Sequence, residues 1–124
     1  MVNYIATFEV DGGISHGFGL SEPQNYEERR EFEFDEEYSS EQVLAKSVCL
    51  GRKIAVDALS NPITELTRVT LLKLCGPKGE INQKDFTSKY THIEDKNGNS
   101  ISFKKNDLGQ IILEDHSFEK ILRL

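Results

Sequence analysis

The segment YSSEQVLAKSVCLGRKIAVDALSNP, residues 38–62, constrains the fold of this chain most strongly, because it predicts one long amphipathic helix. Ser39 is suited to cap the N-terminus of this helix, and Gln42 three residues later completes a capping box. Asn61 and Pro62 end it, because the residue before a proline is biased away from helical geometry. At about 100° per residue, the apolar side chains gather on one arc, formed by Val43, Leu44, Val48, Leu50, Ile54, Ala58 and Leu59. This pattern predicts a helix over Ser40–Ser60 that packs on a sheet.

Small side chains lie near the centre of that arc. Ser47, Gly51 and Ala55 are spaced four apart, and residues of this size allow a helix backbone to approach a sheet closely. We therefore interpret Gly51 as a packing residue. Cys49 in this helix and Cys75 further on are interpreted as small, buried or half-buried apolar residues, since two cysteines do not make a disulfide framework.

Two segments before the helix alternate between apolar and polar residues with the period of a half-buried strand. In residues 3–10 one side carries Tyr4, Ala6, Phe8 and Val10. In REFEFDE, residues 30–36, Phe32 and Phe34 lie on one side, and the other side carries Glu31, Glu33 and Asp35. We expect these strands to be antiparallel neighbours joined by a long loop.

The remaining elements complete the fold prediction. TRVTLLKLCG, residues 67–76, is apolar on both sides in its middle, which favours an interior strand. Residues 89–103 predict a hairpin with its turn at Asn97 and Gly98, residues 109–115 a further strand, and residues 117–124 a short helix. The predicted fold class is α+β: a single antiparallel-dominated sheet with one long helix on one face, in the order β-β-α-β, then the hairpin and the further strand. Residues 1–124 form one domain in this interpretation, with a β-rich extension from about residue 77 to 124 as the alternative.

The charge of the chain is acidic and uneven. Fifteen Lys and Arg residues stand against 21 Asp and Glu residues, which gives a net charge of −6. This balance disfavours nucleic acid as a partner, because phosphate neutralisation supplies most non-specific affinity. The acidity is concentrated in residues 26–38, where Glu31, Glu33 and Asp35 would share one strand face. That face is a solvated surface or a docking surface for another protein with a basic surface. A third interpretation is that the strand lies at the edge of the sheet, where charge discourages unwanted pairing.

The glycine-rich stretch VDGGISHGFGL, residues 10–20, raises the question of a phosphate-binding loop. Such a loop needs a helix after it, whereas a proline and a charged segment follow here. The glycine spacing also matches no phosphate-binding motif; the glycines are Gly12, Gly13, Gly17 and Gly19. We therefore predict a turn followed by a mobile loop over residues 11–24. His16 in that loop is the one residue that points to the alternative, a ligand or a proton carrier.

No other pattern of known chemistry is present. The three histidines have no helical i, i+4 spacing, and the chain has no CxxC, so we expect no metal site and no cofactor. The alternative is a site gathered from His16, His92 and a carboxylate such as Glu94. DKNGNS, residues 95–100, begins like a calcium loop, but Ser100 stands where that loop requires glycine.

These observations favour a small, acidic, soluble protein-interaction module, that is, an adaptor, inhibitor or regulatory subunit rather than an enzyme. The alternative is a small-molecule-binding or enzymatic domain that uses residues 11–24 and His16. A homo-oligomer of structural role is also compatible with the composition. The apolar runs are too short to span a membrane, and the first ten residues do not resemble a signal peptide. We therefore expect a cytoplasmic location.

Overall fold

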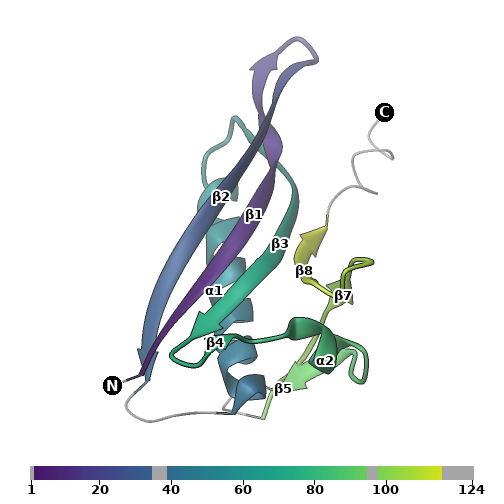
Figure 1. The fold of residues 1–124 in the computed structure, drawn as a ribbon. Coiled ribbons are helices and arrows are strands. Elements are labelled where there is room, and N and C mark those ends of the chain that lie inside the picture. The colour runs from purple at the N-terminus through teal and green to yellow at the C-terminus, as the bar shows by residue number, and fades with distance from the viewer. Residues whose placement is uncertain (1, 35–38, 95–97, 116–124) are drawn as a thin grey trace.

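The computed structural model describes residues 2–34, 39–94 and 98–115 and confirms the α+β fold class (Figure 1). The strands are β1 Val2–Gly17, β2 Leu20–Phe34, β3 Thr64–Gly76, β4 Gly79–Glu80, β5 His92–Glu94, β6 Ser100–Ser102, β7 Lys104–Lys105 and β8 Ile111–Asp115. The helices are α1 Ser40–Leu59 and α2 Gln83–Thr87. The predicted C-terminal helix over residues 117–124 lies outside the described residues.

One antiparallel sheet dominates the structure. Its strand order is β2-β1-β3-β8-β7, and β4 pairs with the end of β3. Because β3 lies between β1 and β8, its predicted interior position is confirmed. The predicted hairpin around Gly98 is also present as β5 and β6, but these two strands form a small sheet of their own.

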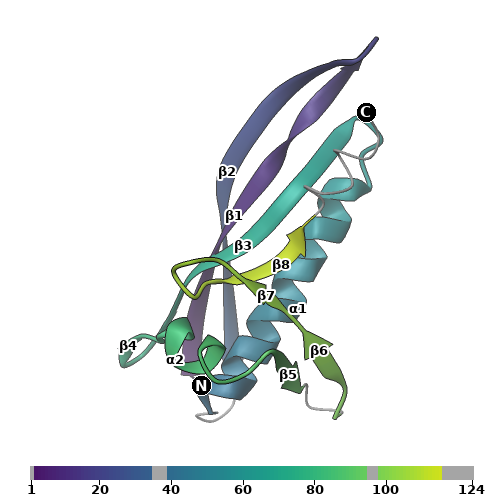
Figure 2. The same cartoon turned by 90° about the vertical axis from the view of Figure 1, so that its right-hand side faces the viewer.

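Helix α1 begins as its sequence predicts. The amide N–H of Gln42 donates to Ser39 Oγ at 3.3 Å, and the amide N–H of Ser39 donates to Gln42 Oε1 at 3.2 Å, so the capping box is formed. The helix covers one face of the sheet, as Figures 1 and 2 show. Within the described residues, no helix is long and apolar enough to cross a membrane.

Two side chains of α1 differ from the prediction. Leu59, expected on the apolar arc, is 50% exposed because it projects from the margin of that arc in the last turn. Cys49, expected to be buried or half-buried, is exposed, because it lies two residues from Gly51 and therefore on the opposite side of the helix. The buried residues of α1 are Val43, Leu44, Ala45, Ser47, Val48, Gly51, Ile54 and Ala55.

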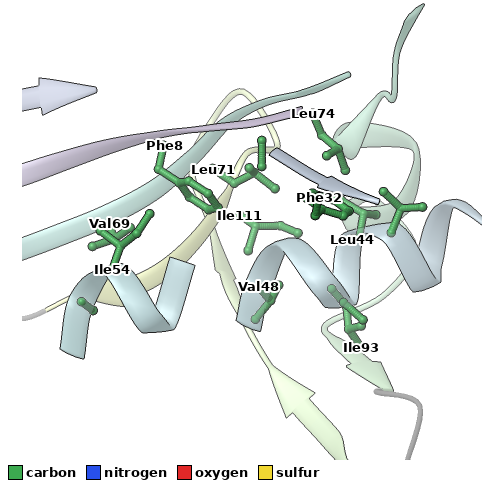
Figure 3. Close-up of a cluster of buried hydrophobic side chains, with 14 of the residues drawn as sticks. Phe8, Phe32, Leu44, Val48, Ile54, Val69, Leu71, Leu74, Ile93 and Ile111 are labelled. Carbon is green, nitrogen blue, oxygen red and sulfur yellow. The ribbon is translucent and has the colours of Figure 1, made fainter. Parts of the chain in front are cut away.

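The core lies between α1 and the sheet, and Figure 3 shows its central side chains. The alternation predicted for β1 is confirmed, since Tyr4, Ala6, Phe8 and Val10 are all buried. Gly51 has the predicted packing role: a Cβ there would overlap the side chain of Leu113 and lie 2.8 Å from Phe8 Cε1. Ile93 of β5 and Ile111 of β8 belong to the same buried cluster, so the C-terminal segment contributes to this core.

Helix α2, which no sequence pattern predicts, connects β8 to β3 through hydrogen bonds of Gln83. The buried side chain of Gln83 donates from Nε2 to the carbonyl oxygen of Leu71 at 2.8 Å. Its Oε1 accepts from the amide N–H of Ile111 at 3.0 Å. One amide therefore satisfies a backbone acceptor on β3 and a backbone donor on β8, two groups that would be costly to bury unpaired.

The prediction of a long loop between the first two strands is wrong. β1 and β2 continue through it as one hairpin, paired from Val2 with Phe34 to Ser15 with Ser21. The turn is only Phe18 and Gly19, both at positive φ, as a two-residue hairpin turn requires. Pro23 is tolerated in β2 because this strand lies at the edge of the sheet.

Candidate interaction surface on the first hairpin

The acidic face of β2 is defined by its register against β1. Directly opposed residues of an antiparallel pair share one face of the sheet. Tyr4 opposes Phe32, and both are buried toward α1. Ile5 opposes Glu31, so Glu31 projects from the other face, which α1 does not cover.

Glu31 and Glu33 therefore lie together, as predicted, and both are exposed. Asp35, the third residue predicted for this face, lies outside the described residues. We call the side of β2 that faces away from α1 the acidic face; its described carboxylates are Glu27, Glu31 and Glu33.

The register also reveals residues that the sequence pattern did not place. Glu27 opposes Glu9 of β1 on the acidic face, and like charges in this position repel. Arg29 opposes Thr7 on the same face, between Glu27 and Glu31, so one guanidinium offsets part of the repulsion. Alternation within β2 could have placed Glu27, but only the pairing with β1 could bring in Glu9.

Arg30 plays a different part from Arg29. It opposes Ala6 and therefore lies on the side of β2 that faces α1. There its guanidinium lies 2.8 Å from Glu28 Oε2. Because Arg30 pairs with Glu28 on that side, Arg29 is the single cation of β2 on the acidic face.

The glycine-rich segment is divided between two environments. Gly12 and Gly13 lie within β1, where the backbones of β3 and β2 approach closely. Gly17 and Gly19 flank Phe18 at the turn, with φ of 80° and 76°, and a Cβ at either position would meet no atom within 4 Å. The two pairs of glycines thus have separate structural roles and do not surround a common site.

His16 is exposed near the end of the hairpin, as predicted, but in a bulge and not in a mobile loop. It is the extra residue between Ser15 and Gly17 where the register shifts. Its Nε2 lies 3.0 Å from Glu22 Oε2 across the hairpin. Figures 1 and 2 place β5, with His92 and Glu94, at the opposite end of the molecule, so these residues do not gather with His16.

A hollow of about 210 Å³ lies beside the hairpin, at the C-terminal end of α1. Gly12, Gly13 and Tyr26 line it, but His16 does not. Burial raises the pKa of Tyr26, Glu28 raises it further, and Arg30 lowers it. Tyr26 therefore stays a neutral phenol to higher pH than an unperturbed tyrosine. A larger hollow of about 440 Å³ lies near α2 and includes none of the predicted site residues.

The structure places no metal centre among the residues that it describes: no three of their His, Cys, Asp and Glu side chains are grouped to hold an ion. No protein family, characterised protein or solved structure matches this chain.

The turn of the hairpin carries backbone strain that can be measured. Phe18 has φ 53°, a conformation that bulky residues rarely adopt, and its side chain is fully exposed. Phe18→Asn creates the Asn-Gly sequence that such turns prefer. We expect this change to stabilise the protein by about 1 kcal/mol, which corresponds to a rise of about 4 °C in the thermal midpoint.

Thermal denaturation followed by circular dichroism measures this effect. Leu20→Asn is the control, because Leu20 is also exposed but has no positive φ. It removes an apolar side chain without relieving strain, so its midpoint should not rise. An unchanged or lower midpoint for Phe18→Asn contradicts the strained turn.

Proposed function

We propose that this chain is a protein-interaction module that binds a basic partner protein on the acidic face of β2. In this function it acts as an adaptor, inhibitor or regulatory subunit without catalytic activity of its own. The observation that carries the proposal is the alignment of Glu27, Glu31 and Glu33 on one uncovered face of an edge strand. Complementary charge on a partner would steer its approach and favour one orientation.

The arrangement of the hairpin supports this proposal over a merely solvated face. On this side of β2 three carboxylates outnumber one guanidinium, that of Arg29, and Glu9 of β1 adds a fourth carboxylate across the register. Lys73 of β3 lies on the same face, opposite Thr7 and one strand further from the edge. The repulsion between Glu9 and Glu27 lowers the stability of the hairpin. A cation of a basic partner placed near both carboxylates would offset that repulsion. We place this interaction in the cytoplasm, where thiols such as the exposed Cys49 stay reduced.

Charge reversal tests the proposal. The full chain is used as bait for affinity capture from its source cells, either unchanged or with Glu31→Lys and Glu33→Lys together. We expect the reversed bait to lose the basic proteins that the unchanged bait recovers, because four units of charge change on the proposed surface. The loss should be largest at low ionic strength, where surface charges are screened least.

A matched control separates the surface from the net charge. Glu80→Lys with Glu94→Lys makes the same change in net charge at two exposed carboxylates in β4 and β5, away from β2. This control should recover the same basic proteins as the unchanged bait. Equal recovery by all three baits at low salt would contradict the proposed function.

A further inference from the structure

Strand β2 presents an open edge of the sheet. It is a 15-residue strand that pairs with β1 alone in the described sheet. It is the end strand of the sheet order, and Figure 1 shows it at the outer border below the point where it crosses β1. Within the described part of the chain, the backbone of residues 20–33 has no hydrogen-bond partner outside this hairpin. One row of its N–H and C=O groups is therefore free to pair with another strand.

Two of the features that normally block such an edge, a proline and a bulge, act only near the tip, and charged side chains are the feature that remains along the rest. Pro23 interrupts the donors near the tip, and the bulge at His16 lies there too. From Gln24 to Glu33 the strand has no proline, and its register against β1 is unbroken. This stretch is long enough to pair with a whole strand of ordinary length.

The excess of carboxylates on this stretch favours a positively charged partner strand over a second copy of this chain. A second copy pairing antiparallel at this edge would join two acidic faces into one, with six carboxylates against two guanidinium groups from residues 27–33 of both strands. A strand with Lys or Arg at every second position would instead place its cations beside the carboxylates. Side chains alternate with period two, so its other positions would fall on the opposite face, beside Tyr26, which is 41% exposed.

We propose that the open edge of β2 between Gln24 and Glu33 binds an extended segment of the basic partner by strand addition. The segment carries Lys or Arg at alternate positions toward the acidic face and apolar residues toward Tyr26. This inference rests on the proposed function and deepens it: backbone pairing supplies the affinity, and the alternating charges supply the specificity.

A synthetic peptide of about ten residues, alternating Lys and Val, is the probe, since this length spans the stretch at about 3.4 Å per residue. Its matched control has the same side chains and charge, but alternate backbone nitrogens are methylated so that one edge cannot donate. Fluorescence anisotropy measures the affinity of both peptides for the full chain at low ionic strength. We expect the unmethylated peptide to bind more tightly by about tenfold or more, because several backbone hydrogen bonds are lost from the control.

Hydrogen exchange locates the bound strand. The unmethylated peptide should slow exchange of backbone amides within residues 24–33. The variant with Glu31→Lys and Glu33→Lys should lose both the binding and this protection. Protection elsewhere, or protection unaffected by charge reversal, would overturn strand addition.

The remaining outcomes separate this inference from the function on which it rests. If both peptides bind equally and charge reversal weakens both, the acidic face binds basic chains but β2 does not add a strand. If neither binds, strand addition is overturned, while the capture experiment tests the proposed function independently. A dimer in sedimentation velocity that protects residues 24–33 without peptide would show that a second copy occupies the edge, which also overturns the proposal.

Discussion

Replacing Phe8 with alanine is expected to lower the free energy of unfolding by about 3–5 kcal/mol. The ring of Phe8 is fully buried between β1 and α1 (Figure 3). Gly51 approaches so closely that a Cβ there would lie 2.8 Å from Phe8 Cε1, so helix backbone forms one wall of the space left by the ring. Backbone held in a helix relaxes little, and the cavity would stay open. Urea denaturation followed by circular dichroism measures the loss.

Two further variants show whether the loss comes from the cavity. Phe8→Leu keeps most of the buried volume and should cost less than Phe8→Ala. Asn3→Ala, at an exposed position of the same strand, should change the free energy of unfolding by less than about 0.5 kcal/mol. A Phe8→Ala protein as stable as the unchanged chain would show that this ring does not lie in the core.

Local sequence signals predicted α1 because they all agree. The capping box, the apolar arc and the Asn-Pro stop are each formed by residues within a few positions of one another. The buried face of β1 was predictable for the same reason, since alternation is a local pattern. Exposed Leu59 shows the limit, because the arc predicts a direction but not where the covering sheet ends.

The length of the first hairpin was not predictable from local signals. Gly12, Gly13 and Pro23 each favour a turn or a loop in isolation. In the structure, the backbone of β3 approaches Gly12 more closely than a side chain would allow. Pro23 costs no hydrogen bond between strands, because β2 lies at the edge of the sheet. Tertiary pairing thus overrides local propensity, as is common for strands.

The candidate surface was predictable only within one strand. Alternation placed Glu31 and Glu33 on one face, but the register between β1 and β2 is needed to add Glu9. Register depends on the position of the turn. The turn at Phe18 could not be predicted, because phenylalanine is unfavourable at the positive φ that this position adopts. The short α2 offered too few residues for any periodic pattern, so the bridging role of Gln83 could not be foreseen.

The second large effect is expected for Gly12→Ala, which should lower the free energy of unfolding by about 3 kcal/mol, at the upper end for overpacked sites. The added Cβ would overlap the carbonyl oxygen of Glu65 and lie 3.2 Å from Leu66 Cα. Both are backbone atoms of β3, so β1 and β3 must separate where the register already shifts. Urea denaturation again measures the loss, and hydrogen exchange should show faster opening of Thr64–Leu66.

The size of the stability loss in Gly12→Ala distinguishes close strand packing from ligand binding as the reason for this glycine. Gly19→Ala is the control, because its Cβ would meet no atom within 4 Å and the cost comes only from φ 76°. That cost is about 1 kcal/mol, so Gly12→Ala should be clearly the more damaging change. If Gly12→Ala left stability unchanged, close strand packing would not explain this glycine, and a role in ligand binding beside the hollow at Tyr26 would gain weight. A large loss instead makes Gly12 the residue that lets β3 support the long hairpin, and with it the open edge of β2.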